Sequence, residues 1–390
     1  MHQDTITINP LESTHFGCSI SLPNYCQNDP ANLNNEDFKK LNEAVHKYLV
    51  VVIPNQAELK PSSQYLLTKR FDPSIPEAKD SSGGYGHGKE FRHSQSVLKK
   101  DGCSVKSQPQ VQILGQGKLE ANEEGNENGE TINLTHPSHT TFHHTPLTEE
   151  EIKNKQTRFY RWHIDSALYD LSPPMVTTLL GIKVPPTTQY QTIKYDDGSE
   201  LKLTQGATCF VSGAQAFKNL SEEDKQFALN TIVEYAPHPY IFISPAKATS
   251  DGLTMVNEDK EMRFEDLPEW EESKVKKLPM VWTNPITKEH HLQVHGCCLY
   301  NLHTKTEDGT KTLGLKESRE KVRKLMRPSI SPDQVLAHSW KQGDLVLFFN
   351  RGVWHSVTGE FKGQGTNGQD ERRLMHQCNI ASGIDPITNI

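Results

Sequence analysis

The stretch Arg161-Trp162-His163-Ile164-Asp165 is the part of this chain that says most about its fold and chemistry. On a β-strand, the spacing of His163 and Asp165 turns an imidazole and a carboxylate to the same face. With a second, distant histidine, such a pair makes the two-histidine, one-carboxylate set that holds Fe(II) and leaves coordination positions open. The tripeptide is common by chance, so the rest of the sequence has to supply a third ligand and a co-substrate anchor.

The third ligand is expected downstream, next to a predicted core strand. Residues 343–350 form a short apolar, β-prone run bounded by Gly343 and Asn350, which predicts a buried strand. His355 follows shortly after, and we expect it just past this strand, at a loop edge from which a ligand can face inward. Two other groups of histidines are not expected to bind a metal. The first lies in a Thr/Pro-rich stretch, expected to be a loop near the site, and consists of His136, His139, His143 and His144. The second lies in a predicted hairpin and consists of His290, His291 and His295.

The last predicted strand, residues 372–380, carries an unusual polar face. A period of two places Arg373, Gln377 and Asn379 on one side and Arg372 on the other. Polar groups that project into a protein interior cost stability unless something binds them. This face therefore indicates a binding site.

These motifs resemble the taurine dioxygenase-like group of Fe(II)/2-oxoglutarate oxygenases, and within it the fungal xanthine dioxygenases. The resemblance runs over most of the chain. The metal and arginine motifs belong to the whole superfamily, whereas fewer residues support the purine assignment. The segments that carry the resemblance as a whole are residues 16–20, 50–56, 158–171, 173–180, 206–213 and 377–380.

The resemblance implies a mainly β fold with flanking helices, built as a double-stranded β-helix (a jelly-roll, clavaminate synthase-like barrel). It implies Fe(II) as cofactor, held by His163, Asp165 and His355, with 2-oxoglutarate and O₂ as co-substrates. Arg373 is the expected anchor for the distal carboxylate of 2-oxoglutarate, because a guanidinium matches a carboxylate bidentately. Arg372 is its competitor, and we favour Arg373 because it shares a face with Gln377 and Asn379. Thr208 matches a threonine that assists the co-substrate in this group.

The resemblance also implies hydroxylation of xanthine at C8 to urate, with release of succinate and CO₂. A purine dione presents alternating donors and acceptors, which amide side chains can satisfy. Gln377 and Asn379 are the expected substrate residues, with Gln112 and Gln110 as weaker candidates on one face of a predicted strand at residues 110–114. An acidic side chain near the entrance, such as Glu149 or Glu150, is a further candidate that the sequence does not fix.

Composition excludes several classes of function. The net charge of −7 argues against a nucleic-acid or anionic-membrane surface. No apolar run approaches the ~20 residues that span a bilayer, and the first residues lack a signal-peptide pattern. Seven cysteines without framework spacing indicate reduced thiols. We therefore expect a soluble, cytoplasmic enzyme that binds a small molecule; the oligomeric state is open, a homo-oligomer included.

For the domain organisation, we expect residues 1–390 to form a single dioxygenase domain. Helices are predicted at 35–48, from 222 and at 318–326, and buried strands at 49–53 and 176–184. Residues 115–129 are acidic and rich in Gly and Asn, which predicts a mobile surface insertion. A helical and hairpin insertion is expected at about 217–335, between the two halves of the barrel. The segment 356–371 is long and rich in Gly and Lys. It is either a harmless hairpin extension or a segment that displaces Arg373 from the site.

Two other functions remain open. One is the same mechanism acting on a sulfonate or another small acid, which predicts a cationic substrate pocket rather than one lined by amides. The other is a non-catalytic barrel that binds a ligand without turnover, which predicts a degraded triad. The intact set of His163, Asp165 and His355, together with Arg373, argues against the second of these.

Overall fold

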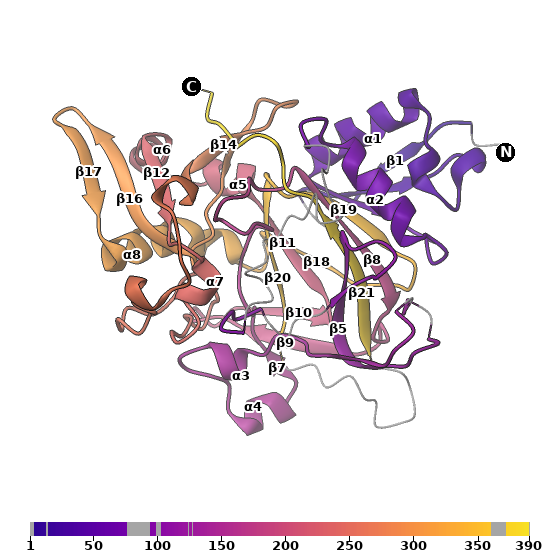
Figure 1. Ribbon diagram of the computed structural model, residues 1–390, viewed down its shortest axis with the longest axis horizontal. Coiled ribbons are helices and arrows are strands. Elements are labelled where there is room, and N and C mark those ends of the chain that lie inside the picture. Colours follow the sequence, from indigo (N-terminus) through magenta and orange to yellow (C-terminus); the bar gives the residue numbers. More distant parts are fainter. Residues whose placement is uncertain are drawn as a thin grey trace.

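The computed structural model describes residues 4–12, 15–75, 94–98, 103–123, 125–126, 128–359 and 372–389. In these ranges the protein is mainly β, with helices at the periphery (Figure 1). The largest sheet runs in the order β1-β2-β3-β19-β8-β21-β5-β4, with β6 paired to β5. Its strands are β1 (Thr7–Pro10), β2 (Cys18–Ser21), β3 (Val50–Ile53), β4 (Cys103–Ser104), β5 (Val111–Leu119), β6 (Ile132–Leu134), β8 (Val176–Lys183), β19 (Leu345–Phe349) and β21 (Arg373–Asn379).

The centre of this sheet is the apolar run that predicted a core strand. All five residues of β19 are buried, and β3 and β8 pair with it in antiparallel register, one on each edge, which makes it an interior strand of the sheet. β21 pairs with β8 and β5, so the polar face expected for this strand lies in the middle of the sheet. The predicted strands at 49–53 and 176–184 are confirmed as β3 and β8.

A second, three-stranded sheet lies against the first. Its order is β18-β11-β20, formed by β11 (Thr208–Ser212), β18 (Val335–His338) and β20 (Val353–Val357). Phe210 and Val353 of this sheet belong to the same buried cluster as Leu347 of the large sheet. A further small sheet, in the order β10-β9-β7, contains β7 (Gln156–Thr157), β9 (Tyr190–Lys194) and β10 (Glu200–Thr204).

The chain between β11 and β18 makes a separate region with its own sheet, on the left of Figure 1. It spans most of the range 217–335 where an insertion is expected, and its sheet runs β13-β12-β16-β17. Its elements are α5 (Gly213–Lys218), α6 (Glu222–Leu229), β12 (Thr231–Tyr235), α7 (Pro239–Phe242), the short 3₁₀ helices Phe264–Asp266 and Glu272–Lys274, β13 (Lys277–Pro279), β14 (Val281–Thr283), β15 (His290–Leu292), β16 (Leu299–Thr306), β17 (Gly309–Leu313), α8 (Leu315–Met326) and the 3₁₀ helix Arg327–Ile330.

Helices pack on a face of the large sheet, and others lie at the lower end of the molecule in Figure 1. The helix expected at 35–48 is present as α1 (Asn35–Tyr48), where the Asn34 side chain accepts a hydrogen bond from the Asp37 backbone N–H and caps the first turn. The helices expected from 222 and at 318–326 are confirmed as α6 and α8. The remaining helices are α2 (Pro61–Arg70), α3 (His139–Phe142), α4 (Glu149–Lys153) and the 3₁₀ helices Asn24–Cys26 and Pro30–Asn32.

The expectation of a surface insertion over 115–129 is wrong in its first part. β5 continues to Leu119, so the start of the expected insertion lies in the large sheet next to β21. Gly115 permits this, because it has a φ of +148° and a Cβ there would lie 1.6 Å from the Arg373 carbonyl oxygen. Glu123, farther along, is bound to Arg372 and Lys183. Glu124 and Glu127 lie outside the described residues, as do residues 360–371 of the long segment before β21.

None of the seven cysteines, all of which lie in the described ranges, is in a disulfide bond. Of the described helices, none is both long and apolar enough to cross a membrane.

Candidate metal centre and its pocket

The two predicted histidine ligands are brought together by a direct backbone pairing. His163 and His355 form an isolated antiparallel bridge, in which each backbone N–H donates to the other residue's carbonyl at 3.0 and 2.9 Å. The expected placements of both are therefore corrected. His163 and Asp165 do not lie in a regular strand, and His355 lies in the middle of β20 rather than past a strand, because β20 pairs along its length with β11.

Asn350 holds the segment of His163 and Asp165 in place of a regular strand ladder. Its side-chain oxygen accepts from the Asp165 backbone N–H, and its amide nitrogen donates to the Asp165 carbonyl, both at 2.8 Å. Asn350 follows the last residue of β19, so the end of this strand fixes the backbone of Asp165. Among the described residues, His163, Asp165 and His355 are the one group of side chains whose ligand atoms converge, all lying within 4.8 Å of one another.

Hydrogen bonds orient the ligand atoms toward a common point. The His163 Nδ1 lies 3.0 Å from the Arg161 carbonyl, which can only accept, so Nδ1 carries the proton and Nε2 is free to bind a metal. The Asp165 Oδ2 accepts from Thr177 Oγ1 at 2.7 Å and from Gln377 Nε2 at 3.3 Å. Its Oδ1 lies 3.9 Å from His163 Nε2 and 3.6 Å from His355 Nε2. The three free donor atoms, two imidazole nitrogens and one carboxylate oxygen, fit Fe(II).

Burial favours the protonation states that a metal needs in its histidine ligands. It lowers the pKa of His163 well below its usual value and the pKa of His355 to about 3, with Arg161 contributing in both cases. Both imidazoles are therefore neutral at neutral pH, which is the form that ligates. Burial raises the pKa of Asp165, which favours the neutral form of its side chain. A cation bound beside it would stabilise the ionised carboxylate.

Arg373 is the predicted anchor, and it lies on the same cavity. It is buried, its Nε donates to the Gly206 carbonyl at 3.0 Å, and its Nη2 donates to Thr208 Oγ1 at 3.1 Å. Burial lowers its pKa to about 10, which leaves it charged at neutral pH. No carboxylate of the described residues pairs with it. Arg372 lies on the opposite face, where Glu123 binds it, as the strand parity predicted. The long segment before β21 therefore does not displace Arg373 from the cavity.

The metal-ligand triad and Arg373 line one cavity of about 140 Å³. Gln112, Gln377, Asn379 and Thr208 line it too, so the structure brings these predicted residues together. Gln110 does not: β5 begins at Val111, and Gln110 belongs to the turn before it. The other lining residues are Leu98, Leu114, Gly115, His136, Pro137, Tyr160, Arg161, Ser166, Leu179, Tyr240 and Val357.

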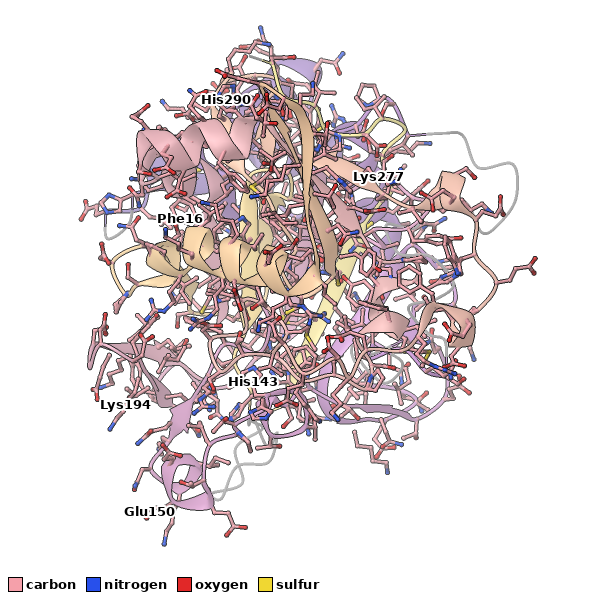
Figure 2. The ribbon with its side chains drawn as sticks, turned by 90° about the vertical axis from the view of Figure 1, so that its left-hand side faces the viewer. Phe16, His143, Glu150, Lys194, Lys277 and His290 are labelled. Carbon is pink, nitrogen blue, oxygen red and sulfur yellow. The ribbon has the colours of Figure 1, made fainter. Side chains whose placement is uncertain are left out.

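Several of these lining residues were not foreseen. His136 belongs to a group of histidines expected only near the site, yet it lines the cavity and its Nε2 lies 2.7 Å from the Thr358 carbonyl. No pattern in the sequence marked Tyr240 as a cavity residue, and Arg161 was marked only by its position two residues before His163. Glu149 and Glu150 do not line the cavity; Figure 2 shows Glu150 at the outer tip of the molecule, on α4.

Two facing sheets enclose a centre of two histidines and one carboxylate. Beside it lies buried Arg373, which pairs with no carboxylate of the described residues. These features together are those of an oxygenase of the Fe(II)-binding class. The sequence profile of the "Taurine catabolism dioxygenase TauD, TfdA family" matches residues 9–379. The chain belongs to this family, which confirms the resemblance inferred from the motifs. Membership implies Fe(II), 2-oxoglutarate and O₂.

Curated relatives extend over nearly the whole chain. It is 46% identical over 385 residues to the alpha-ketoglutarate-dependent xanthine dioxygenase of Emericella nidulans, covering 97% of each chain. It is 42% identical over 383 residues to the corresponding xanthine dioxygenase of Schizosaccharomyces pombe, covering 97% of this chain and 87% of that one.

Solved structures share the fold at low sequence identity. A putative alpha-ketoglutarate-dependent taurine dioxygenase from Burkholderia xenovorans superposes with a TM-score of 0.55 at 18% identity, covering 98% of this chain and 92% of that one. AAD-2, solved with Mn(II) and N-oxalylglycine, superposes with a TM-score of 0.56 at 17% identity, covering 99% of this chain and all of that one.

Proposed function

We propose that this protein hydroxylates xanthine at C8 to form urate, consuming O₂ and converting 2-oxoglutarate to succinate and CO₂. The observation that carries the proposal is the 46% identity, over 97% of both chains, to a xanthine dioxygenase. The cavity supports it, because three amide side chains surround the metal centre: Gln112, Gln377 and Asn379.

His163, Asp165 and His355 would hold Fe(II), which supplies the activation of O₂ that the protein's own side chains cannot perform. The part played by the chain is to keep both imidazoles neutral, to direct His163 Nε2 through the Arg161 carbonyl, and to fix the carboxylate of Asp165 through Thr177. No side-chain general base is required, because a C–H bond is broken rather than an acidic proton removed.

Arg373 would bind the distal carboxylate of 2-oxoglutarate. Its Nε and Nη2 are used by Gly206 and Thr208, which fix the plane of the guanidinium and leave its remaining N–H donors for the ligand. Thr208 also accepts from Trp340 Nε1 at 3.0 Å, so its hydroxyl is locked in place. Thr208 would therefore position Arg373, and its own O–H would be left to donate to the co-substrate.

The three amide side chains of the cavity would have two roles. Gln377 donates to Asp165, and a hydrogen bond from Asn379 to Asp165 helps to keep that carboxylate ionised, so both support the metal ligand as well as lining the cavity. Gln112 lies on β5 directly opposite Gln377 in the register of the two strands. This places the amides on adjacent strands, where the donor and acceptor edge of a purine dione can meet them.

The two facing sheets support a double-stranded β-helix as the architecture, in one domain over residues 1–390. β11 and β18, which flank the region containing the expected 217–335 insertion, are direct neighbours in the smaller sheet. The inserted region therefore leaves the sheet and returns to it at adjacent strands. The partners of such a domain are small molecules, a purine among them.

Anaerobic titration with Fe(II) and 2-oxoglutarate tests the metal and co-substrate roles. A visible charge-transfer band should develop in the wild-type protein and be absent in Asp165→Ala; its absence in the wild type would contradict the oxygenase assignment. For the substrate, Fe(II)-dependent formation of urate from xanthine should match succinate mole for mole. Consumption of taurine or a related sulfonate, with xanthine left unchanged, would contradict the purine assignment.

A further inference from the structure

Arg161 is a buried cation without a counter-ion. Its side chain is 4% exposed, and its Nε and Nη1 make no hydrogen bond although both are shielded from solvent. No carboxylate in the described part of the chain forms an ion pair with it. Its guanidinium carbon lies 5.0 Å from the ring centre of Tyr240 and 5.7 Å from that of Tyr160, and these aromatic contacts fix its place without using its N–H donors.

Burying an unpaired guanidinium is costly, because its charge loses water and gains no acceptor. Two other buried arginines of the described ranges have acceptors. Arg319 pairs with Glu261, and Arg351 donates to the carbonyls of Pro173 and Ile384. Arg161 differs from these two, because no carboxylate or carbonyl of the described residues is bonded to its Nε or Nη1, and it lines the same cavity as the candidate metal ligands.

A count of charge around the cavity indicates what is missing. Arg161 and Arg373 are the arginines of the cavity lining, and Asp165 is its carboxylate. Their sum is one positive charge. A divalent metal and the dianion of 2-oxoglutarate offset each other, so the loaded cavity retains this excess. Arg373 faces the co-substrate, which leaves Arg161 as the group that is not compensated.

We infer that Arg161 is a specificity-determining residue that binds the purine substrate through a carbonyl oxygen and the adjacent deprotonated ring nitrogen. This inference rests on the proposed function. It adds one cationic contact with the substrate, made by Arg161, to the contacts made by the amide side chains. A guanidinium matches such an edge with two parallel N–H donors, whereas an ammonium offers a point charge. Tyr160 and Tyr240, which also line the cavity, hold the guanidinium in this orientation.

The test measures substrate binding without turnover. Protein loaded anaerobically with Fe(II) and 2-oxoglutarate is titrated with xanthine, and the change in the visible charge-transfer band reports the Kd. Arg161→Gln should raise the Kd for xanthine about 10- to 100-fold, as expected for a lost charged hydrogen bond, and leave the Kd for 2-oxoglutarate unchanged. Arg161→Lys, which keeps the charge and most of the side-chain volume, should show a smaller rise and serves if the glutamine variant does not fold.

Arg158→Gln is the matched control, since Arg158 lies in the same segment but outside this cavity, with its guanidinium bonded to the Thr145 carbonyl. It should bind xanthine as the wild type does. An unchanged Kd for xanthine in both Arg161 variants, or a loss of 2-oxoglutarate binding instead, would overturn the inference while the wild type still forms urate. If wild-type protein binds no xanthine at all, the proposed function and the inference both fail.

Discussion

Thr177→Val tests whether the carboxylate ligand is positioned from behind. The Thr177 hydroxyl is completely buried and donates to Asp165 Oδ2 at 2.7 Å, and valine keeps its shape while removing this donor. A hydrogen bond to a charged group contributes about 1.5–3 kcal/mol, which is roughly 10- to 100-fold in affinity. Gln377 continues to donate to the same oxygen at 3.3 Å, so we expect the lower part of this range, a loss of about 10- to 30-fold in Fe(II) affinity.

The neighbouring residue supplies the control. Thr178 is equally buried but lies on the opposite face of β8, where its hydroxyl contacts Gln64 Nε2 at 3.1 Å and Thr68 Oγ1 at 2.8 Å. Thr178→Val should lower the thermal unfolding midpoint and leave metal binding alone. The assay is anaerobic titration of Fe(II) into protein saturated with 2-oxoglutarate, followed by the charge-transfer band. Equal Fe(II) affinity in wild type and Thr177→Val, or equal losses in the two valine variants, would refute the positioning role.

Two further changes test the arginine assignments. Arg373→Met should raise the Kd for 2-oxoglutarate about 10- to 100-fold, because a buried charged contact is lost; titration with 2-oxoglutarate measures it, and an unchanged Kd would contradict the anchor. Hydrogen bonding to Arg372, with Lys183 adding to it, lowers the pKa of Glu123 to about 2. The folded state then holds this carboxylate more strongly than the unfolded state, so its stabilisation is complete above about pH 4.3 and is lost as the pH falls toward 2. Glu123→Gln should therefore flatten the free energy of unfolding over this acid range in urea titrations; an unaltered slope would contradict the ion pair.

The convergence of His163, Asp165 and His355 and the place of Arg373 on the same cavity could be predicted because their signals are local. Alternation along β21 needs only a period of two, and it correctly separated Arg373, which lines the cavity, from Arg372, which binds Glu123 on the other side. The same reasoning failed for Gln110, since it presumed that the strand had already begun. A strand boundary depends on where a partner strand ends, and β21 pairs with β5 only from Val111 onward.

Other features depend on contacts far apart in sequence, and no local pattern carries them. The ligand segment was expected to be a strand because of its spacing, but its geometry comes from the Asn350 side chain and from the bridge to His355. Arg161 was visible as a residue beside the ligands. Whether a carboxylate reaches it is decided by the packing of the rest of the chain, so its unpaired state could be seen only in the folded structure.

The register of β21 determines which of its side chains face the cavity. Arg373, Gln377 and Asn379 lie on one strand, so a slip by a single residue would turn all three side chains away from the cavity together. The acidic segment that the composition marked as an insertion opposes this slip. Gly115 admits the Arg373 carbonyl at a distance that no side chain allows, Glu123 binds Arg372, and the Gly125 carbonyl lies 2.9 Å from His376 Nε2. This polar segment therefore holds the strand that carries Arg373, Gln377 and Asn379, by backbone contact and by charge.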